Sequence, residues 1–258
     1  MSTRMHIQTG DNVGIGGFII MGSAPKHVIL RAIGPSLTSS GITGPLVDPV
    51  LELHGPDGFV TIVNNNWRGS VQEAEIIATG IPPTEDLESA IVTTLDPGAY
   101  TAIVKGLGNT SGVGLVEIYD LNQEVDSRLA NLSTRAQVGT QEDRVIAGFL
   151  LGGNEGELDR VIVRGIGPSL AGTFPANTLL ADPTLELRDA DGALIMQNND
   201  WQDDGAQASE ILAAGLAPIN GQESAIAATL APGPYTALLG GTNNGTGIGV
   251  VEIYDQGL

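Results

Sequence analysis

Cysteine is absent from the 258-residue chain, which excludes disulfides, thiolate metal sites and thiol nucleophiles. Basic residues are also few, because 11 Lys and Arg stand against 30 Asp and Glu and give a formal net charge of -19. A field of this sign repels phosphate backbones, so nucleic acid and anionic membranes are poor partners. The sequence has no apolar run of about 18 residues, the length that a membrane helix needs, and we expect no membrane insertion.

Histidine is scarce as well, and the three residues of this type, His6, His27 and His54, all lie in the first half of the chain. The sequence lacks a Gly-x-Ser-x-Gly elbow and a His-Glu-x-x-His motif. We therefore expect that the protein is not an enzyme. A hydrolase working with a carboxylate pair is a less supported alternative, because carboxylates are plentiful throughout so acidic a chain.

What the sequence does contain is one unit written twice. The segment Val28–Leu37 (VILRAIGPSL) returns as Val161–Leu170 (VIVRGIGPSL). Further matching pairs follow in the same order: Asp48-Pro49 with Asp182-Pro183, Glu88–Ile91 with Glu223–Ile226, and Val116–Asp120 with Val251–Asp255. The repeat predicts two domains, residues 1–121 and 133–258, joined by a linker at residues 122–132.

Short apolar stretches separated by Gly, Pro, Asn and Asp recur through each copy, which is typical of a β-sandwich. In the first copy we expect strands at residues 12–21, 27–33, 48–53, 59–63, 89–95, 99–104 and 112–119. One helix is predicted in each copy, at 70–80 and 206–215, because a glycine suited to a C-terminal cap ends both segments. The predicted fold class is all-β: two tandem jelly-roll-like β-sandwich domains, each with one short helix.

An arginine interrupts the apolar strand at the centre of each copy. Arg31 and Arg164 share a strand face with isoleucines, and an arginine that faces a core needs a partner of opposite charge. We expect a structural buried pair, which would fix strand register more than add stability; a ligand site is the alternative. The candidate partners are Glu117 and Glu252, or else Glu52 and Glu186.

The two tryptophans of the chain each follow a run of amide and carboxylate side chains, Asn64–Asn66 and Asn198–Asp200. Many carbohydrate modules use tryptophan beside Asn or Asp to stack on a sugar and to hydrogen-bond it. This pattern identifies the candidate ligand-binding residues Asn66, Trp67, Asp200 and Trp201. The alternative is that each indole covers the end of its own core while the asparagines cap a loop.

Carboxylates on predicted turns make calcium a possible cofactor, because hard cations bind clustered oxygen ligands. The candidates in the first copy are Asp48, Asp57, Asp86, Glu88 and Asp120, with echoes at Asp182, Asp191, Glu223 and Asp255. The sequence has no contiguous Asp-x-Asp-x-Asp-Gly loop. Solvated turn carboxylates are therefore the alternative, and no ligand set for a metal is assigned.

The chain resembles an uncharacterised repeat of large secreted bacterial surface proteins, whose units open with Ser-Thr-Arg and a Gly-Gly-Phe strand. The matching segments are Arg31–Leu37, Leu87–Ile91, Pro97–Thr101, Gly114–Asp120 and Asp182–Leu187. More distantly, the Pro-Gly-x-Tyr-Thr strand entry and the Asp-Gly hairpin turn are similar to β-sandwich domains of the pre-peptidase C-terminal type. That resemblance implies an accessory, non-catalytic module on exported proteins, sometimes associated with calcium or matrix binding.

These observations predict a non-catalytic structural or adhesive module that is extracellular or at the cell surface. We expect it to be part of a longer secreted protein, because its first repeat opens at Ser2-Thr-Arg4. Self-association through exposed strands and binding of a surface polysaccharide are the partners compatible with this role. A carbohydrate-binding module that uses the Trp and Asn loops is the alternative function.

Overall fold

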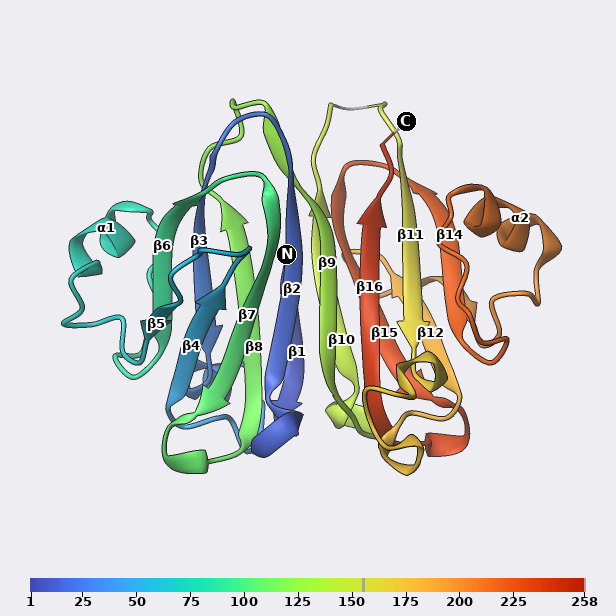
Figure 1. Ribbon diagram of the computed structural model, residues 1–258, viewed down its shortest axis with the longest axis horizontal. Helices are drawn as coiled ribbons and strands as arrows, with labels where there is room; N and C mark the ends of the chain where they lie inside the picture. Colours follow the sequence, from blue (N-terminus) through green and yellow to red (C-terminus); the bar gives the residue numbers. More distant parts are fainter. Residues whose placement is uncertain (155, 258) are drawn as a thin grey trace. The chain divides into compact units, whose positions relative to one another are not determined.

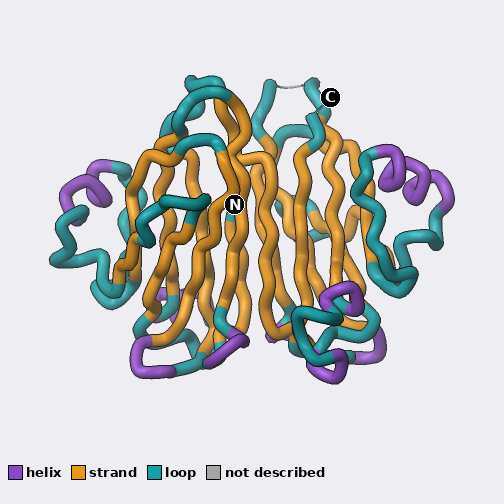
Figure 2. The backbone as a smooth tube through the Cα atoms, viewed as in Figure 1, coloured by secondary structure: helices purple, strands orange, loops and turns teal. Residues whose placement is uncertain are grey.

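A computed structural model describes residues 1–154 and 156–257 of the chain. The chain forms two compact units, Met1–Leu132 and Ser133–Leu258. Strands are the predominant regular structure in each unit, and the helices are short (Figure 2). None of the helices in the described part of the chain is long and apolar enough to cross a membrane.

The first unit has one α-helix, α1 (Glu73–Ala78), and eight complete strands within its described residues. These strands are β1 (Ser2–Ile7), β2 (Gly14–Gly22), β3 (Lys26–Ile33), β4 (Pro49–His54), β5 (Ile62–Asn64), β6 (Ser89–Leu95), β7 (Gly98–Gly106) and β8 (Gly112–Asp120).

The second unit repeats the same order of elements around α2 (Gly205–Ala213). Its first strand, β9 (Ser127–Val138), begins before the boundary between the units. The others are β10 (Val145–Leu151), β11 (Asp159–Ile166), β12 (Pro183–Arg188), β13 (Leu194–Asn198), β14 (Ser224–Leu230), β15 (Gly233–Gly241) and β16 (Gly247–Asp255).

Each unit is a jelly roll made of two antiparallel sheets (Figure 1). In the first unit the strand orders are β1-β8-β3-β6 and β2-β7-β4-β5. In the second unit they are β9-β16-β11-β14 and β10-β15-β12-β13. Two four-stranded sheets connected in this order form the eight-stranded jelly roll, and the predicted all-β fold class is confirmed.

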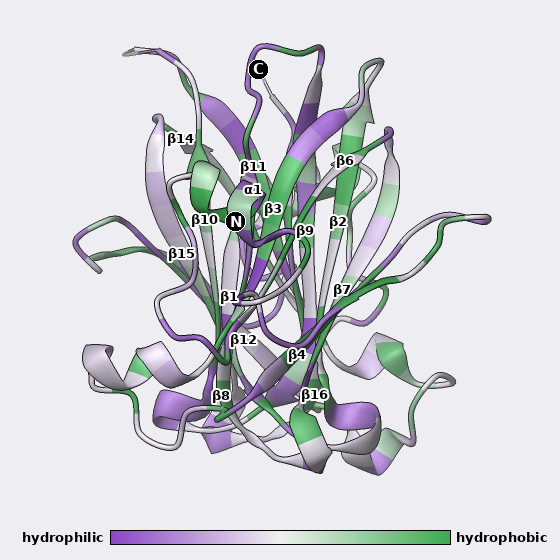
Figure 3. Ribbon diagram, turned by 90° about the vertical axis from the view of Figure 1, so that its left-hand side faces the viewer, coloured by the Kyte–Doolittle hydropathy of each residue, from purple (hydrophilic) through white to green (hydrophobic). Residues whose placement is uncertain are grey.

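The central strand β3 is buried on both of its faces. Val28 and Leu30 are 0% exposed and point to one face, whereas Ile29 points to the other and packs with Trp67 and Ile76. The segment that carries α1 therefore covers the outer face of this sheet, beside β6 (Figure 1). A strand covered on both faces reads as a continuous apolar run, and hydrophobic residues accordingly extend along β3 and β6 (Figure 3).

The two predicted helices are confirmed and both end before a glycine with positive φ, Gly80 at 76° and Gly215 at 70°. α2 is the longer helix because the side chain of Asp204 accepts hydrogen bonds from the backbone N–H groups of Ala206 and Gln207. The residue before α1, Gln72, makes no such side-chain bond.

Three expectations about elements differ from the structure. Residues 122–132, expected as a linker, include the start of β9, which begins at Ser127 and buries Leu132. β5 is shorter than residues 59–63, since the N–H of Phe59 is held in a turn by the oxygen of Pro56. β1 was not expected as a strand, because its polar residues hide the alternation that buries Met5 and Ile7.

Candidate functional site

The arginine of β3 lies on the face that the α1 segment covers. Arg31 stands opposite Glu117 in the pairing of β3 with β8, and its Nε donates to Glu117 Oε2 at 2.9 Å. Its Nη1 donates to the backbone oxygen of Ile81 at 2.8 Å, which ties the strand to the segment above it. Tyr119 OH donates to the other carboxylate oxygen at 2.7 Å, and burial, reinforced by Glu117, raises the pKa of Tyr119 to about 12.

The second unit repeats this network. Arg164 Nε donates to Glu252 Oε2 at 2.8 Å, and its Nη1 donates to the oxygen of Leu216 at 3.0 Å. Burial, followed by the charge of Glu252, raises the pKa of Tyr254. Each arginine shares a strand face with an isoleucine, as expected, and this face packs against the helical segment of its unit; the isoleucines are Ile29 and Ile162.

The structure thus brings together the first of the two alternative sets of partners. The other two glutamates lie on β4 and β12, in the opposite sheet of each unit, and contact other cationic groups. Glu52 contacts Lys105 and His54, and Glu186 contacts Arg144 and Arg188.

A fully buried glutamate holds the Gly-Pro-Ser turn that follows β3. Glu88 accepts hydrogen bonds from the backbone N–H groups of Gly34 and Ser36, at 3.1 and 3.0 Å, and from Ser36 Oγ at 2.5 Å. Glu223 holds the equivalent turn in the second unit in the same way. Because the carboxylate is hydrogen-bonded to Ser36 Oγ and to the backbone, the two side chains stabilise the conformation of the turn.

The tryptophans are buried and offer no face to a sugar. Trp67 is 1% exposed and Trp201 is 6% exposed, and each packs among apolar side chains of its helix and sheet. The prediction that they form a stacking platform is therefore wrong, because a sugar needs an open aromatic face. Trp67 Nε1 donates to the oxygen of Glu85 at 2.9 Å, whereas Trp201 Nε1 has no partner among the described residues.

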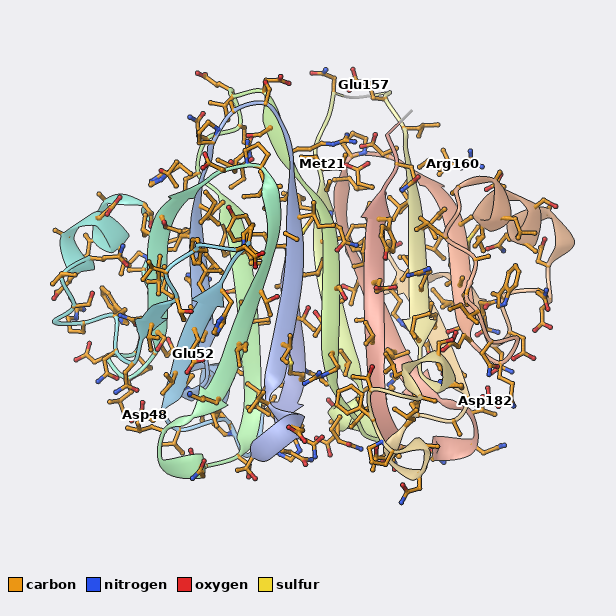
Figure 4. The ribbon with its side chains drawn as sticks, viewed as in Figure 1. Met21, Asp48, Glu52, Glu157, Arg160 and Asp182 are labelled. Atoms are coloured by element: carbon orange, nitrogen blue, oxygen red, sulfur yellow. The ribbon has the colours of Figure 1, made fainter. Side chains whose placement is uncertain are left out.

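The residues before each tryptophan lie at a polar corner, where the start of one strand meets the end of the next. In the first unit Ser89 Oγ contacts three backbone oxygens, which places the start of β4 beside the end of β5. These oxygens belong to Pro49, Asn64 and Asn65, at 2.6, 2.9 and 2.8 Å. Asp48 lies at the start of β4, directly before Pro49 (Figure 4).

Three side-chain oxygens in this corner have no donor. The Oδ1 atoms of Asp48, Asn65 and Asn66 are buried and lack a hydrogen-bond partner within the described chain. Burial raises the pKa of Asp48. We name these three residues the first corner.

The equivalent residues Asp182, Asn199 and Asp200 are named the second corner. Asp182 Oδ1 is buried and again has no hydrogen-bond partner in the part of the chain that the structure describes. Asn199 Oδ1 accepts from Thr242 Oγ1 at 2.6 Å, and the N–H of Thr242 donates to the backbone oxygen of Asp182 at 2.9 Å. Burial, then the negative charges of Asp203 and Asp182, raise the pKa of Asp200.

The carboxylates that were expected to share a cation do not gather in one place. Asp86 accepts from Arg68, Glu88 fastens its turn, and Asp120 lies 2.9 Å from the buried Lys26. The described residues include no group of three or more His, Asp or Glu side chains that could hold a metal ion. Within the expected set, Asp48 and Asp182 keep a buried oxygen without a donor among the described residues.

A cavity of about 140 Å³ lies beside the arginine network of the second unit. Its lining includes Arg164, Glu252, Ser169 and the fully buried Glu223. Ile219, which is 92% exposed, also lines it. Since the polar side chains are bonded in two pairs, Arg164 with Glu252 and Ser169 with Glu223, the cavity offers mainly apolar contact to an occupant.

Comparisons with known proteins give little beyond the fold itself. No family model matches the chain, and no curated protein matches it. Among solved structures, a chain from an atomic structure of Sulfolobus Turreted Icosahedral Virus is similar over 98% of this chain and 85% of that chain. The two are 14% identical with a TM-score of 0.26, a level of likeness that carries no argument about function.

Proposed function

We propose that the chain is a non-catalytic extracellular module with a structural or adhesive role, built from two tandem β-sandwich repeats. One observation supports the proposal: the charged residues that recur in both copies make hydrogen bonds within their own unit. Arg31 and Glu88 each bind backbone atoms of a neighbouring segment, and Arg164 and Glu223 do the same. A signature that recurs because it holds the fold together is what a scaffold module requires.

The charge of the chain supports an exported location. Its formal net charge of -19 keeps the surface solvated and favours an environment that supplies counterions, such as salt or divalent cations outside a cell. This charge also favours neutral or cation-bridged polysaccharide over nucleic acid as a surface partner.

An exposed sheet edge supports self-association. β5 pairs with β4 on one side and ends the order of its sheet in the described chain. Val60 and Val63, beside and within this strand, are 82% and 58% exposed. An open edge with apolar side chains is a surface on which a strand of another copy can pair.

The carbohydrate-binding alternative is weakened because both indoles are buried. A glycan would have to be bound without aromatic stacking. We therefore keep the structural or adhesive role as the proposal, and glycan binding as an outcome to be tested on an array.

Sedimentation velocity over a range of concentrations tests the adhesive part of the proposal. We expect the wild type to self-associate and Val63→Lys to weaken association, because a charge on an edge strand opposes pairing. Val71→Lys is the matched control, since Val71 is fully exposed outside the sheets. A wild type that stays monomeric at every concentration would count against self-association.

Cell fractionation and an activity screen test the remaining parts. Expression of the tagged chain in its source organism should place it in the surface or medium fraction. Retention in the cytoplasm, or turnover in a broad hydrolase screen that one carboxylate substitution abolishes, would overturn the proposal.

A further inference from the structure

The two corners contain buried oxygens that the protein itself leaves without donors. Three such atoms belong to the residues of the first corner, on Asp48, Asn65 and Asn66, and none has a hydrogen-bond partner among the described residues. Buried polar atoms in folded proteins nearly always have a hydrogen-bond partner, and one without a partner destabilises the folded state. An occupant that accepts electron density from several oxygens would remove this cost for all three.

Hydrogen bonds hold together the chain segments that carry these oxygens. Ser89 Oγ joins the backbone of Pro49, directly after Asp48, to the backbone of Asn65. In the second corner Thr242 bridges Asp182 and Asn199 through its backbone N–H and its hydroxyl. Each corner is thus assembled from a strand start and a strand end that are fixed by hydrogen bonds before any occupant binds.

We propose that each corner is a calcium-binding site. Asp48, Asn65 and Asn66 supply oxygen ligands in the first unit, and Asp182 and Asp200 supply them in the second. Calcium fits this donor set because it takes carboxylate and amide oxygens in irregular arrangements, whereas magnesium requires near-ideal octahedral geometry and loses its water reluctantly. The proposal goes beyond the structural role proposed above and does not rest on it.

Two substitutions between the repeats give the two sites different strengths. Asn66 is replaced by Asp200, so the second corner has two carboxylates where the first has one. Leu107 is replaced by Thr242, whose hydroxyl satisfies Asn199, while the corresponding Asn65 Oδ1 has no donor within the described residues. Because calcium affinity rises with the number of charged ligands, the second site binds more tightly.

The charge pattern supports a cation over a water molecule at the second corner. The negative charge of Asp200 is repelled by the charges of Asp203 and Asp182. A water molecule would leave this repulsion in place, and a divalent cation would remove it.

Calorimetric titration of the metal-free chain with CaCl₂ tests the proposal directly. We expect two saturable events with dissociation constants of about 10⁻⁴–10⁻³ M, the range of extracellular calcium modules, and a weaker response to MgCl₂. Asp182→Asn should abolish the tighter event and Asp48→Asn the weaker one. The charge-matched controls are Asp191→Asn and Asp57→Asn, which change exposed turn carboxylates and should keep both events.

Thermal unfolding separates a metal site from a merely structural aspartate. In EDTA, Asp48→Asn and Asp182→Asn should leave the melting temperature unchanged or raise it, because an amide is less costly to bury than an unneutralised carboxylate. In calcium the same variants should lose the rise in melting temperature that the wild type gains. A variant that is destabilised equally in both conditions would contradict the proposal.

Terbium luminescence assigns each event to its unit. Terbium replaces calcium at oxygen sites and is excited through a nearby indole, and each corner directly precedes a tryptophan, Trp67 or Trp201. We expect tryptophan-sensitised emission that calcium displaces, and Trp201→Phe should remove the component with the higher affinity. No saturable heat and no sensitised emission from the wild type would overturn the proposal, as would unchanged binding in the double variant Asp48→Asn, Asp182→Asn.

Discussion

The two units share their internal networks of hydrogen bonds and ion pairs, and they differ at the first and second corners. The network of arginine, glutamate and tyrosine is present in both, and so is the glutamate that holds the Gly-Pro-Ser turn. By contrast, Asn66 is matched by Asp200, and Leu107 by Thr242. The repeat has therefore kept the groups that define the fold, while the polar corner has changed its charge and its donors.

The largest expected effect comes from breaking the shared network. Arg31→Met leaves the buried carboxylate of Glu117 without its cation, and we expect a loss of about 3–5 kcal/mol of unfolding free energy. Arg164→Met should cost less, because the side chain of Glu252 is 16% exposed against 9% for Glu117. Urea unfolding followed by fluorescence reads both units, since each contains one tryptophan.

The double variant Arg31→Met, Glu117→Leu provides the control for this experiment. Replacing the whole pair by apolar groups should recover most of the stability, because no unpaired charge remains. Full stability of the single variant Arg31→Met would show that neither the ion pair with Glu117 nor the bond to Ile81 stabilises the unit.

Removing the serine–glutamate hydrogen bond at the Gly-Pro-Ser turn should lower stability less, and by a similar amount in the two units. Ser36→Ala and Ser169→Ala each remove a hydrogen bond to a buried carboxylate, and we expect a loss of about 1.5–3 kcal/mol in each unit. Ser39→Ala, whose exposed hydroxyl bonds only the oxygen of Ser36 among the described residues, should change stability far less. Clearly different losses of unfolding free energy for Ser36→Ala and Ser169→Ala in chemical denaturation would show that the two turns are not equivalent.

The tryptophans should reveal a difference of about 1 kcal/mol between the units. Trp67→Phe loses the bond from Nε1 to the oxygen of Glu85, whereas Trp201→Phe removes an indole N–H that has no partner in the described chain. We expect the first substitution to be the more destabilising. Differential scanning calorimetry is the suitable measurement, because both variants lose their fluorescent probe; equal melting temperatures would contradict the prediction.

The smallest effect is a pH dependence of the metal-free chain. Burial raises the pKa of Asp48 above its ordinary value of 3.8, so the folded state binds this proton more tightly than the unfolded state. Its contribution to stability therefore falls as the pH rises from the unfolded pKa through the folded one. Asp48→Asn should remove this fall, as followed by melting temperature in EDTA from acid to neutral pH.

Glu52 provides the opposite case for comparison. A hydrogen bond from Lys105 lowers the pKa of Glu52 below its ordinary value of 4.5. Its stabilising contribution is present above the unfolded pKa and is lost as the pH falls through the folded one. Glu52→Gln should therefore reduce the fall of melting temperature at acid pH. If Asp48→Asn and Glu52→Gln changed the pH dependence in the same way, these two carboxylates would not control it.

Much of the fold could be predicted because the repeat and the turn residues mark the strands other than β1 and its counterpart β9. The side of the sheet on which Arg31 lies could not be predicted, because both faces of β3 carry apolar residues. Arg31 lies on the face that the α1 segment covers, where it binds the oxygen of Ile81. The role of the Trp67 loop was misjudged for a related reason. Tryptophan beside asparagine has the same sequence whether the indole or the amides face outward, and here the amide oxygens, not the ring, lack partners in the described chain.

The burial of β3 on both faces has a consequence for how each unit opens. Its backbone is paired with β6 on one side and β8 on the other, and layers of side chains cover it above and below. No local fluctuation frees such a strand, so its amide protons should exchange with solvent only when the whole unit unfolds. The exchange rates of the β3 and β11 amides should therefore report separately on the global unfolding of the first and the second unit.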